Sequence, residues 1–138
     1  MMHMILNTFP DLLTFSMFSP FILRVVLGLI VINLGFLKFG KEKVAWQKLF
    51  ETINFLPAKI LVKCLAVVEI AGGFMFLSGA YTQLTAIVFA IIFFCEAILE
   101  YREPVLEKRN ITFYVLMFTI SLSLVFLGAG AFALDLPL

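Results

Sequence analysis

The sequence predicts an all-α, polytopic membrane protein, built as an antiparallel four-helix transmembrane bundle with a short interfacial helix in the first loop. Three observations predict this fold. Hydrophobic residues make up 63% of the 138-residue chain and charged residues only 14%, which is too apolar for a soluble domain of average composition. Four apolar stretches approach or reach the roughly 20 residues that a helix needs to cross a bilayer. Lys and Arg are concentrated in two connections between these stretches.

The four predicted spans take up most of the chain. They cover about 21–39, 59–79, 83–101 and 111–132. We assign them to one transmembrane domain, 21–138. The turn between the second and third spans is so short that it makes these two helices antiparallel neighbours. A compact four-helix bundle is the simplest architecture for such a chain.

Two segments outside the spans are expected to lie in the membrane interface. Residues 1–20 form an N-terminal interfacial arm that is rich in phenylalanine and leucine. In the first loop, apolar residues recur at helical spacing among polar ones, which predicts a short interfacial helix ending near Pro57. We interpret this helix as an amphipathic connector, with a partner-docking surface as the alternative.

The basic residues predict the orientation of the chain in the membrane. The segment 41–59 holds four lysines, and the connection between the third and fourth spans holds Arg102, Lys108 and Arg109. The N-terminal arm, the turn at 78–83 and the C-terminal tail contain no Lys or Arg. The positive-inside rule therefore places both basic loops in the cytoplasm and both termini outside.

Charges inside the spans mark the candidate functional residues, because a charge in lipid costs at least a few kcal/mol unless it is paired, protonated or hydrated. Glu69 lies near the middle of the second span, and Arg24 lies near the outer end of the first. An extended arginine can reach across the gap, so we predict an Arg24–Glu69 ion pair. This pair is either a structural clasp or a polar anchor for a ligand headgroup or a proton.

A second, inner charge cluster is predicted from Lys38, Lys63 and Glu96. These residues reach a similar depth from the cytoplasmic side. In the alternative interpretation, the two lysines extend their amino groups to the lipid headgroups instead.

Small residues mark the faces on which the helices are expected to pack. Glycines share a face with the charges of the first and second spans, and another lies on a stripe of hydroxyl and small residues in the fourth. Small side chains at such positions let transmembrane helices approach closely. The expected helix-packing residues are Gly28, Gly35, Gly72, Gly73 and Gly130.

The sequence offers no motif for self-sufficient catalysis. Cys64 and Cys95 form no C-x-x-C pair, and no zinc spacing, paired-histidine haem site or phosphate loop occurs. We therefore expect no metal, assign no catalytic residue and favour an accessory membrane subunit over an enzyme. The basic residues do not interleave with exposed aromatic ones, so nucleic acid is not an expected partner.

The motifs from Phe21 onward resemble those of the DoxX family of small four-helix membrane proteins. They are Leu23-Arg24 followed by Gly28, Gly35-Phe36-Leu37-Lys38, Glu69-Ile70-Ala71-Gly72-Gly73 leading to Gly79, and a tail at 128–135 that resembles the family's Gly-Pro-Gly-x-aromatic-Ser-Leu-Asp. The chain departs from the family pattern at Leu34, Gln83, Ala129 and Ala133, where many members have His, Arg, Pro and Ser. The missing His weakens any proposal of proton or metal chemistry at the first helix.

The resemblance implies a multi-pass protein of a bacterial or archaeal inner membrane. Family members are similar to a subunit of thiosulfate:quinone oxidoreductase, and others are associated with thiol and superoxide defence complexes. Our leading hypothesis is an accessory subunit of a membrane-associated redox complex, with a quinone as the candidate cofactor near Arg24 and Glu69. The alternatives are a small-solute or lipid transporter and a structural scaffold without chemistry. The lipid bilayer is the expected partner, with a redox protein or a homo-oligomer as further candidates.

Overall fold

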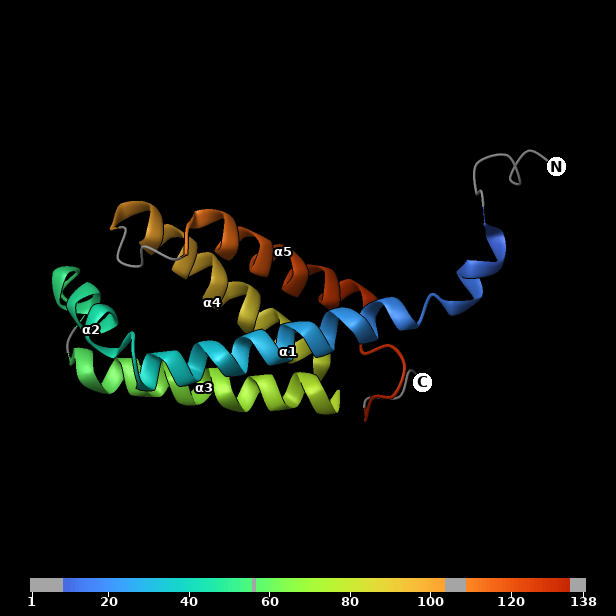
Figure 1. The fold of residues 1–138 in the computed structure, drawn as a ribbon, viewed down its shortest axis with the longest axis horizontal. Helices are drawn as coiled ribbons and strands as arrows, with labels where there is room; N and C mark the ends of the chain where they lie inside the picture. Colours follow the sequence, from blue (N-terminus) through green and yellow to red (C-terminus); the bar gives the residue numbers. More distant parts are fainter. Residues whose placement is uncertain (1–8, 56, 104–108, 135–138) are drawn as a thin grey trace.

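The molecule is a bundle of long helices with shorter helical elements beside it (Figure 1). In the computed structural model the described residues are 9–55, 57–103 and 109–134. The long helices are α1 (Phe18–Phe39), α3 (Ala58–Ser78), α4 (Thr82–Arg102) and α5 (Ile111–Leu127). The shorter elements are the 3-10 helix η2 (Pro10–Phe15) and α2 (Lys43–Thr52). Within the described ranges there is no strand, and the predicted all-α class is confirmed.

Three of the long helices, α1, α3 and α4, have the length and hydropathy needed to cross a membrane. The fourth, α5, is apolar but has only 17 residues. It ends at Leu127 and not at the predicted residue 132, because Gly128 has a φ of +76° and turns the chain out of the helix. Four long helices therefore correspond to the four predicted spans.

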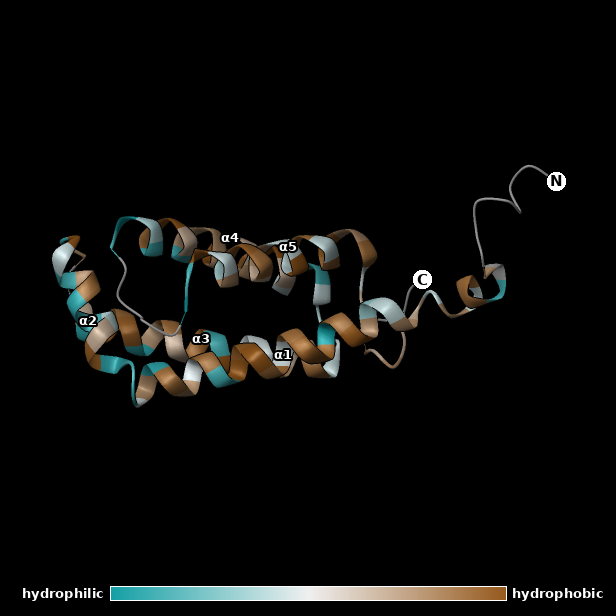
Figure 2. Cartoon of the chain, turned by 45° about the horizontal axis from the view of Figure 1, so that its top comes forward, coloured by the Kyte–Doolittle hydropathy of each residue, from teal (hydrophilic) through white to brown (hydrophobic). Residues whose placement is uncertain are grey.

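The outer surface of the bundle is apolar. Hydrophobic residues run along the length of the long helices, whereas hydrophilic residues are found mainly near their ends (Figure 2). Ile22, Phe74, Ile91 and Phe126 are among the large apolar side chains that are exposed. Helices that are apolar outside as well as inside are typical of a bundle surrounded by lipid, and the chain is a multi-pass membrane protein.

The long helices form two antiparallel pairs. α1 packs along α3, α4 packs along α5, and the two pairs face each other across the core (Figures 1 and 2). The short turn after α3 makes α3 and α4 antiparallel, as predicted, but these two helices touch each other less than the members of either pair. The main helix contacts therefore join α1 to α3 and α4 to α5.

Glycines allow the close approach of α1 and α3. A Cβ added at Gly28 would lie 2.9 Å from the Gly73 carbonyl oxygen, and one added at Gly73 would lie 2.8 Å from the Gly28 carbonyl oxygen. At Gly35 an added Cβ would lie 2.9 Å from the carbonyl oxygen of Ala66. Three of the five predicted packing glycines therefore lie where the backbones of α1 and α3 meet.

The other two predicted packing glycines have different neighbours. Gly72 lies against the ring of Phe89 on α4, so it accommodates an aromatic side chain and not a second backbone. Gly130 lies beyond the end of α5, against Met17 and Pro20 at the beginning of α1. Its assignment to a packing face within the fourth span is wrong, since that helix has already ended at Gly128.

The middle of the core is a layer of apolar and aromatic side chains. Leu27, Val31, Phe76, Phe89 and Phe93 are each at most 1% exposed. The ring of Phe89 lies 5.5 Å from that of Phe76 and 5.9 Å from that of Phe93, measured between centroids. On α1, Leu27 and Val31 lie between the two buried charges of that helix, so this layer separates two polar regions.

The two segments predicted for the interface both contain a short helix. In the first loop, α2 packs Trp46 and Leu49 against Val62 of α3, and it ends at Thr52, before the predicted end near Pro57. In the N-terminal arm, η2 precedes α1, and residues 1–8 lie outside the described part of the chain. The location of both segments at the membrane interface stays a prediction.

Candidate functional site

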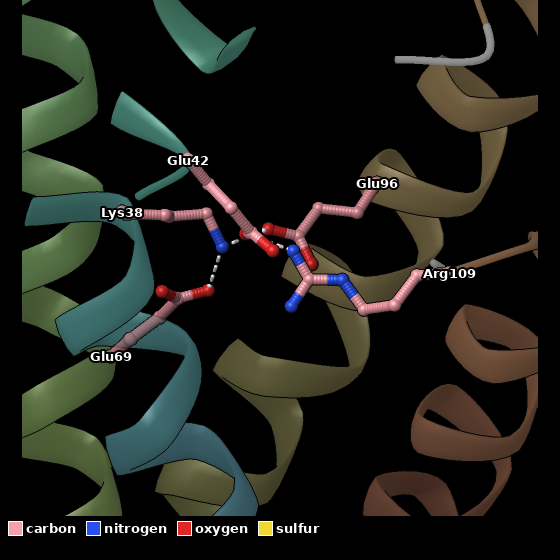
Figure 3. Close-up of polar contacts among 5 residues, drawn as sticks. All are labelled: Lys38, Glu42, Glu69, Glu96 and Arg109. Carbon is pink, nitrogen blue, oxygen red and sulfur yellow. Dashed lines mark hydrogen bonds and ion pairs between the residues drawn. The ribbon is translucent and has the colours of Figure 1, made fainter. Parts of the chain in front are cut away.

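Three charged side chains meet inside the bundle, toward the end that carries the basic loops. Lys38 comes from the last turn of α1, Glu69 from the middle of α3 and Glu96 from α4 (Figure 3). Their exposed fractions are 1%, 0% and 3%. We call these three residues the charge cluster.

The Lys38 ammonium group links the elements around the cluster. Its Nζ donates to Glu69 Oε1 at 2.5 Å and to Glu96 Oε1 at 3.0 Å (Figure 3). The same Nζ lies 4.4 Å from the ring centroid of Trp46, which is a cation–π contact. One ammonium group therefore connects α1 with α2, α3 and α4.

A second ion pair lies beside the cluster. Arg109, just before α5, donates to Glu42, just before α2, and these side chains are 10% and 18% exposed. Figure 3 places the pair next to Glu96. Together the five side chains hold two positive and three negative formal charges. A single proton shared among the carboxyl groups makes the region neutral, which greatly lowers the cost of burying it in a membrane.

Several buried polar atoms around the cluster have no hydrogen-bond partner among the residues that the structure describes. They are Glu69 Oε2, Glu96 Oε2, Trp46 Nε1, Arg109 Nε and Tyr114 Oη. Tyr114 comes from α5, is 1% exposed and lies within electrostatic range of Glu96 and Arg109. Buried polar groups are nearly always hydrogen-bonded in native proteins. Both donors and acceptors are thus available here for a bound molecule or for water.

The predicted ion pair between Arg24 and Glu69 is corrected by the structure, which pairs Glu69 with Lys38. Arg24 Nη2 donates instead to the carbonyl oxygens of Ala131 and Phe132, at 3.1 and 3.2 Å. The alignment of the helices explains the difference. Arg24 lies against Gly79, and Glu69 is ten residues earlier on α3, which corresponds to about 15 Å along a helix.

The Arg24 side chain extends toward the end of the bundle where the chain folds back after α5. The Ala131 amide donates to the Met17 carbonyl oxygen, and the Leu134 amide donates to that of Ser78. Residues 128–134 are thereby fastened to the start of α1 and the end of α3. Arg24 helps to hold this segment in place through its bonds to Ala131 and Phe132. It is therefore not a member of the charge cluster.

The predicted inner cluster is brought together in part. Lys38 and Glu96 meet, and Glu69 takes the place predicted for Lys63. Lys63 is exposed and lines a pocket beside α2. It lies six residues before Glu69, and this spacing turns the two side chains roughly 120° apart on an α-helix.

Sequence reasoning missed the two aromatic side chains of the site. Trp46 is the only tryptophan of the chain, and it lies in the first loop, which the sequence assigns to an interfacial helix and not to the buried charges. Tyr114 lies in the first turn of an apolar helix. A tyrosine in an apolar helix could have indicated the site, because a buried hydroxyl needs a hydrogen-bond partner.

The fold and the cluster define a class of protein, namely small helical membrane proteins with a lysine shared by two intramembrane carboxyl groups. The DoxX family model matches residues 19–100, more than half of the chain, and the chain belongs to the DoxX family. This confirms the family resemblance found in the sequence. The match covers Lys38, Glu69 and Glu96. No curated protein and no solved structure matches the chain.

Proposed function

We propose that this DoxX-family protein is an accessory subunit of a membrane-associated redox complex and holds a quinone headgroup at the charge cluster. The unpartnered buried polar atoms beside the charge cluster carry this proposal. A quinone has two carbonyl oxygens that accept hydrogen bonds. The Trp46 indole and the Tyr114 hydroxyl are buried donors without an acceptor among the described residues.

The carboxyl groups of the cluster suit the same ligand. Reduction of a quinone to a quinol takes up two electrons and two protons. In this proposal the redox partner supplies the electrons, and Glu69 and Glu96 exchange protons with the ligand, which is the ordinary role of positioned carboxyl groups. The chain itself therefore positions the headgroup and handles its protons.

The isoprenoid tail of a quinone requires an apolar surface near the cluster. A groove of about 360 Å³ lies between α4 and α5, and Ala97 and Val115 are among its lining residues. These two residues directly follow Glu96 and Tyr114 in the chain. Pockets for small molecules are mostly apolar with a few polar groups that fix the orientation. In this proposal the groove holds the tail and the cluster holds the headgroup.

Two other functions remain as alternatives. A small-solute or lipid transporter needs a polar path through the membrane. An apolar layer separates the cluster from Arg24, which argues against such a path. It consists of Leu27, Val31, Phe76, Phe89 and Phe93. A structural scaffold accounts for the ion pairs, but it gives no reason to bury the Tyr114 hydroxyl without a partner among the described residues.

The substitution Tyr114→Phe separates the quinone site from a scaffold. If the hydroxyl donates to a quinone, the variant loses one hydrogen bond of about 1 kcal/mol, and quinone affinity falls roughly fivefold. The quinone is measured by solubilising the tagged protein gently from its native membrane and quantifying the extracted quinone per mole of protein. We expect less quinone with Tyr114→Phe and an unchanged amount with Tyr81→Phe, which alters a tyrosine that is 68% exposed.

The stability of the same variants completes the test. A scaffold that buries an unpaired hydroxyl becomes more stable when the hydroxyl is removed, by about 1–3 kcal/mol. A Tyr114→Phe variant that unfolds at a higher temperature and retains all of its quinone, or a wild type that carries none, would contradict the proposal. Recovery of a redox protein with the wild type supports the other part of the proposal, that the chain is an accessory subunit of a redox complex.

We also propose that the basic loops face the cytoplasm. The structure places η2 and residues 128–134 at one end of the bundle and α2 at the other (Figure 1). Finding the side of the membrane on which one end lies therefore locates the other end as well. In a variant with Cys64 and Cys95 replaced by serine, a membrane-impermeant maleimide should label Ser78→Cys in intact cells and should leave Lys41→Cys unlabelled. The reverse labelling pattern means that the chain is inverted.

A further inference from the structure

A basic pocket lies between α2 and the beginning of α3, separate from the charge cluster. Its volume is about 270 Å³, and it is lined by Lys43, Val44, Gln47, Lys59 and Lys63. Residues four apart lie on the same face of a helix, so Lys43 and Gln47 present one edge of α2, and Lys59 and Lys63 present one edge of α3. We call this site the basic pocket.

The three lysines are not balanced by acidic side chains. None of them forms an ion pair with a residue of the described part of the chain. Lys59 and Lys63 are like charges spaced four residues apart, which destabilises a helix. The lining of the pocket therefore holds an excess of positive charge.

The start of α3 adds to this imbalance. The N-terminal end of a helix carries a partial positive charge and is stabilised by acidic residues. The first turn of α3 contains Lys59 and no acidic residue, and its N-cap, Pro57, makes no side-chain capping hydrogen bond. An anion in the pocket would offset part of the charge of the lysines and would also interact favourably with the helix end.

The location of the pocket favours an anion that belongs to the membrane. α3 begins at Ala58 and is one of the membrane-crossing helices, so Lys59 and Lys63 lie in its first two turns. Ile60 and Val44 beside them are apolar and 58% and 61% exposed. Lysines that begin in the apolar region and extend to its edge present their amino groups at the level of the lipid phosphates.

We propose that the basic pocket binds the phosphate of an anionic phospholipid from the leaflet next to the basic loops. The lysine amino groups bind the phosphate, Gln47 offers a hydrogen-bond donor, and Val44 and Ile60 contact the adjoining acyl chains. This inference goes beyond the proposed quinone site and does not depend on it, because none of its residues belongs to the charge cluster.

The test compares lipid binding by matched variants of the full chain. Detergent-solubilised protein is titrated with phosphatidylglycerol or with phosphatidylcholine of the same acyl chains, and bound lipid is counted by native mass spectrometry. We expect the wild type to prefer phosphatidylglycerol by at least fivefold. The variant Lys43→Gln, Lys59→Gln, Lys63→Gln should lose this preference, and the same three positions changed to arginine should keep it.

The control variant removes three positive charges from the same end of the molecule but outside the pocket. Its changes are Lys41→Gln, Lys48→Gln and Arg102→Gln, all at exposed positions. This control should retain the preference for phosphatidylglycerol. An equal loss in both variants would mean that net charge alone attracts the lipid, and the proposal would be wrong.

Inorganic phosphate distinguishes the lipid from a free anion. Addition of millimolar phosphate should leave the binding of phosphatidylglycerol unchanged, because the lipid also contacts apolar side chains. If inorganic phosphate displaces the lipid and binds with similar affinity, the pocket is a site for a free phosphate group and the lipid proposal fails. A wild type that binds both lipids equally overturns it as well.

Discussion

The substitution Lys38→Met should destabilise the bundle by about 3–5 kcal/mol, because it removes the cation from two buried carboxyl groups. Methionine retains the length and the apolar part of the lysine side chain, so the change in packing is small. Glu69 and Glu96, which are 0% and 3% exposed, both lose their hydrogen bonds to Nζ. Breaking a buried pair from one side leaves an uncompensated charge, and this accounts for the size of the effect.

Unfolding is measured by the fluorescence of Trp46 in a denaturant titration of the detergent-solubilised protein. Trp46 is the only tryptophan, and its ring lies 4.4 Å from Lys38 Nζ, so its signal reports on this site. The control Lys63→Met, at an exposed position, should change stability by less than about 0.5 kcal/mol.

A triple variant checks the physical cause of this effect. Adding Glu69→Gln and Glu96→Gln to Lys38→Met removes the unpaired charges, and most of the lost stability should return, since a buried ion pair replaced as a whole is often nearly neutral. If Lys38→Met alone unfolds at the same denaturant concentration as the wild type, Lys38 does not hold the two carboxyl groups together.

The second large effect is expected at Gly73. A side chain here separates α3 from α1, because even a Cβ would lie 2.8 Å from the Gly28 carbonyl oxygen, and this obstacle is backbone. The substitution Gly73→Leu should destabilise the fold by about 3 kcal/mol or more, which is the upper end of the range typical of overpacked cores. We expect the variant to accumulate poorly in membranes and to elute as aggregate in size-exclusion chromatography.

The matched control is Ala71→Leu, two residues earlier on the same helix. Ala71 is exposed on the outer surface of the bundle, so the same added side chain enters lipid without displacing a neighbour. This variant should behave like the wild type in both measurements. Equal behaviour of Gly73→Leu and Ala71→Leu would show that close packing of α1 on α3 is not required for the fold.

The helices could be predicted from the sequence because lipid imposes one strong requirement on them. A spanning helix needs a long apolar stretch, and such stretches locate α1, α3 and α4 within a few residues of their ends. The end of α5 was predicted less well. An apolar stretch continues past Leu127, but the positive φ of Gly128 ends the helix first, and hydropathy carries no information about that backbone angle.

The partners of the buried charges could be predicted only in part, because a residue's depth in the membrane does not determine the direction of its side chain. Their depths predict that Arg24 and Glu69 reach each other, but Arg24 extends away from Glu69 to the carbonyl oxygens of Ala131 and Phe132. Lys38 extends inward to both glutamates. The difference depends on how α1 is aligned along α3, and that alignment is set by the contacts of Gly28 and Gly35.

The order of the partners along the chain has a consequence for the biogenesis of the protein. α1 is synthesised first and carries Arg24 and Lys38. The described side-chain hydrogen-bond and ion-pair partners of these two residues all lie later in the sequence: Glu69, Glu96 and the carbonyl oxygens of Ala131 and Phe132. Until α3 and α4 leave the ribosome, the first helix holds two cations that lipid does not tolerate well. α1 should therefore remain beside the insertion machinery until its partners arrive, and the segments of this small bundle should enter the bilayer together.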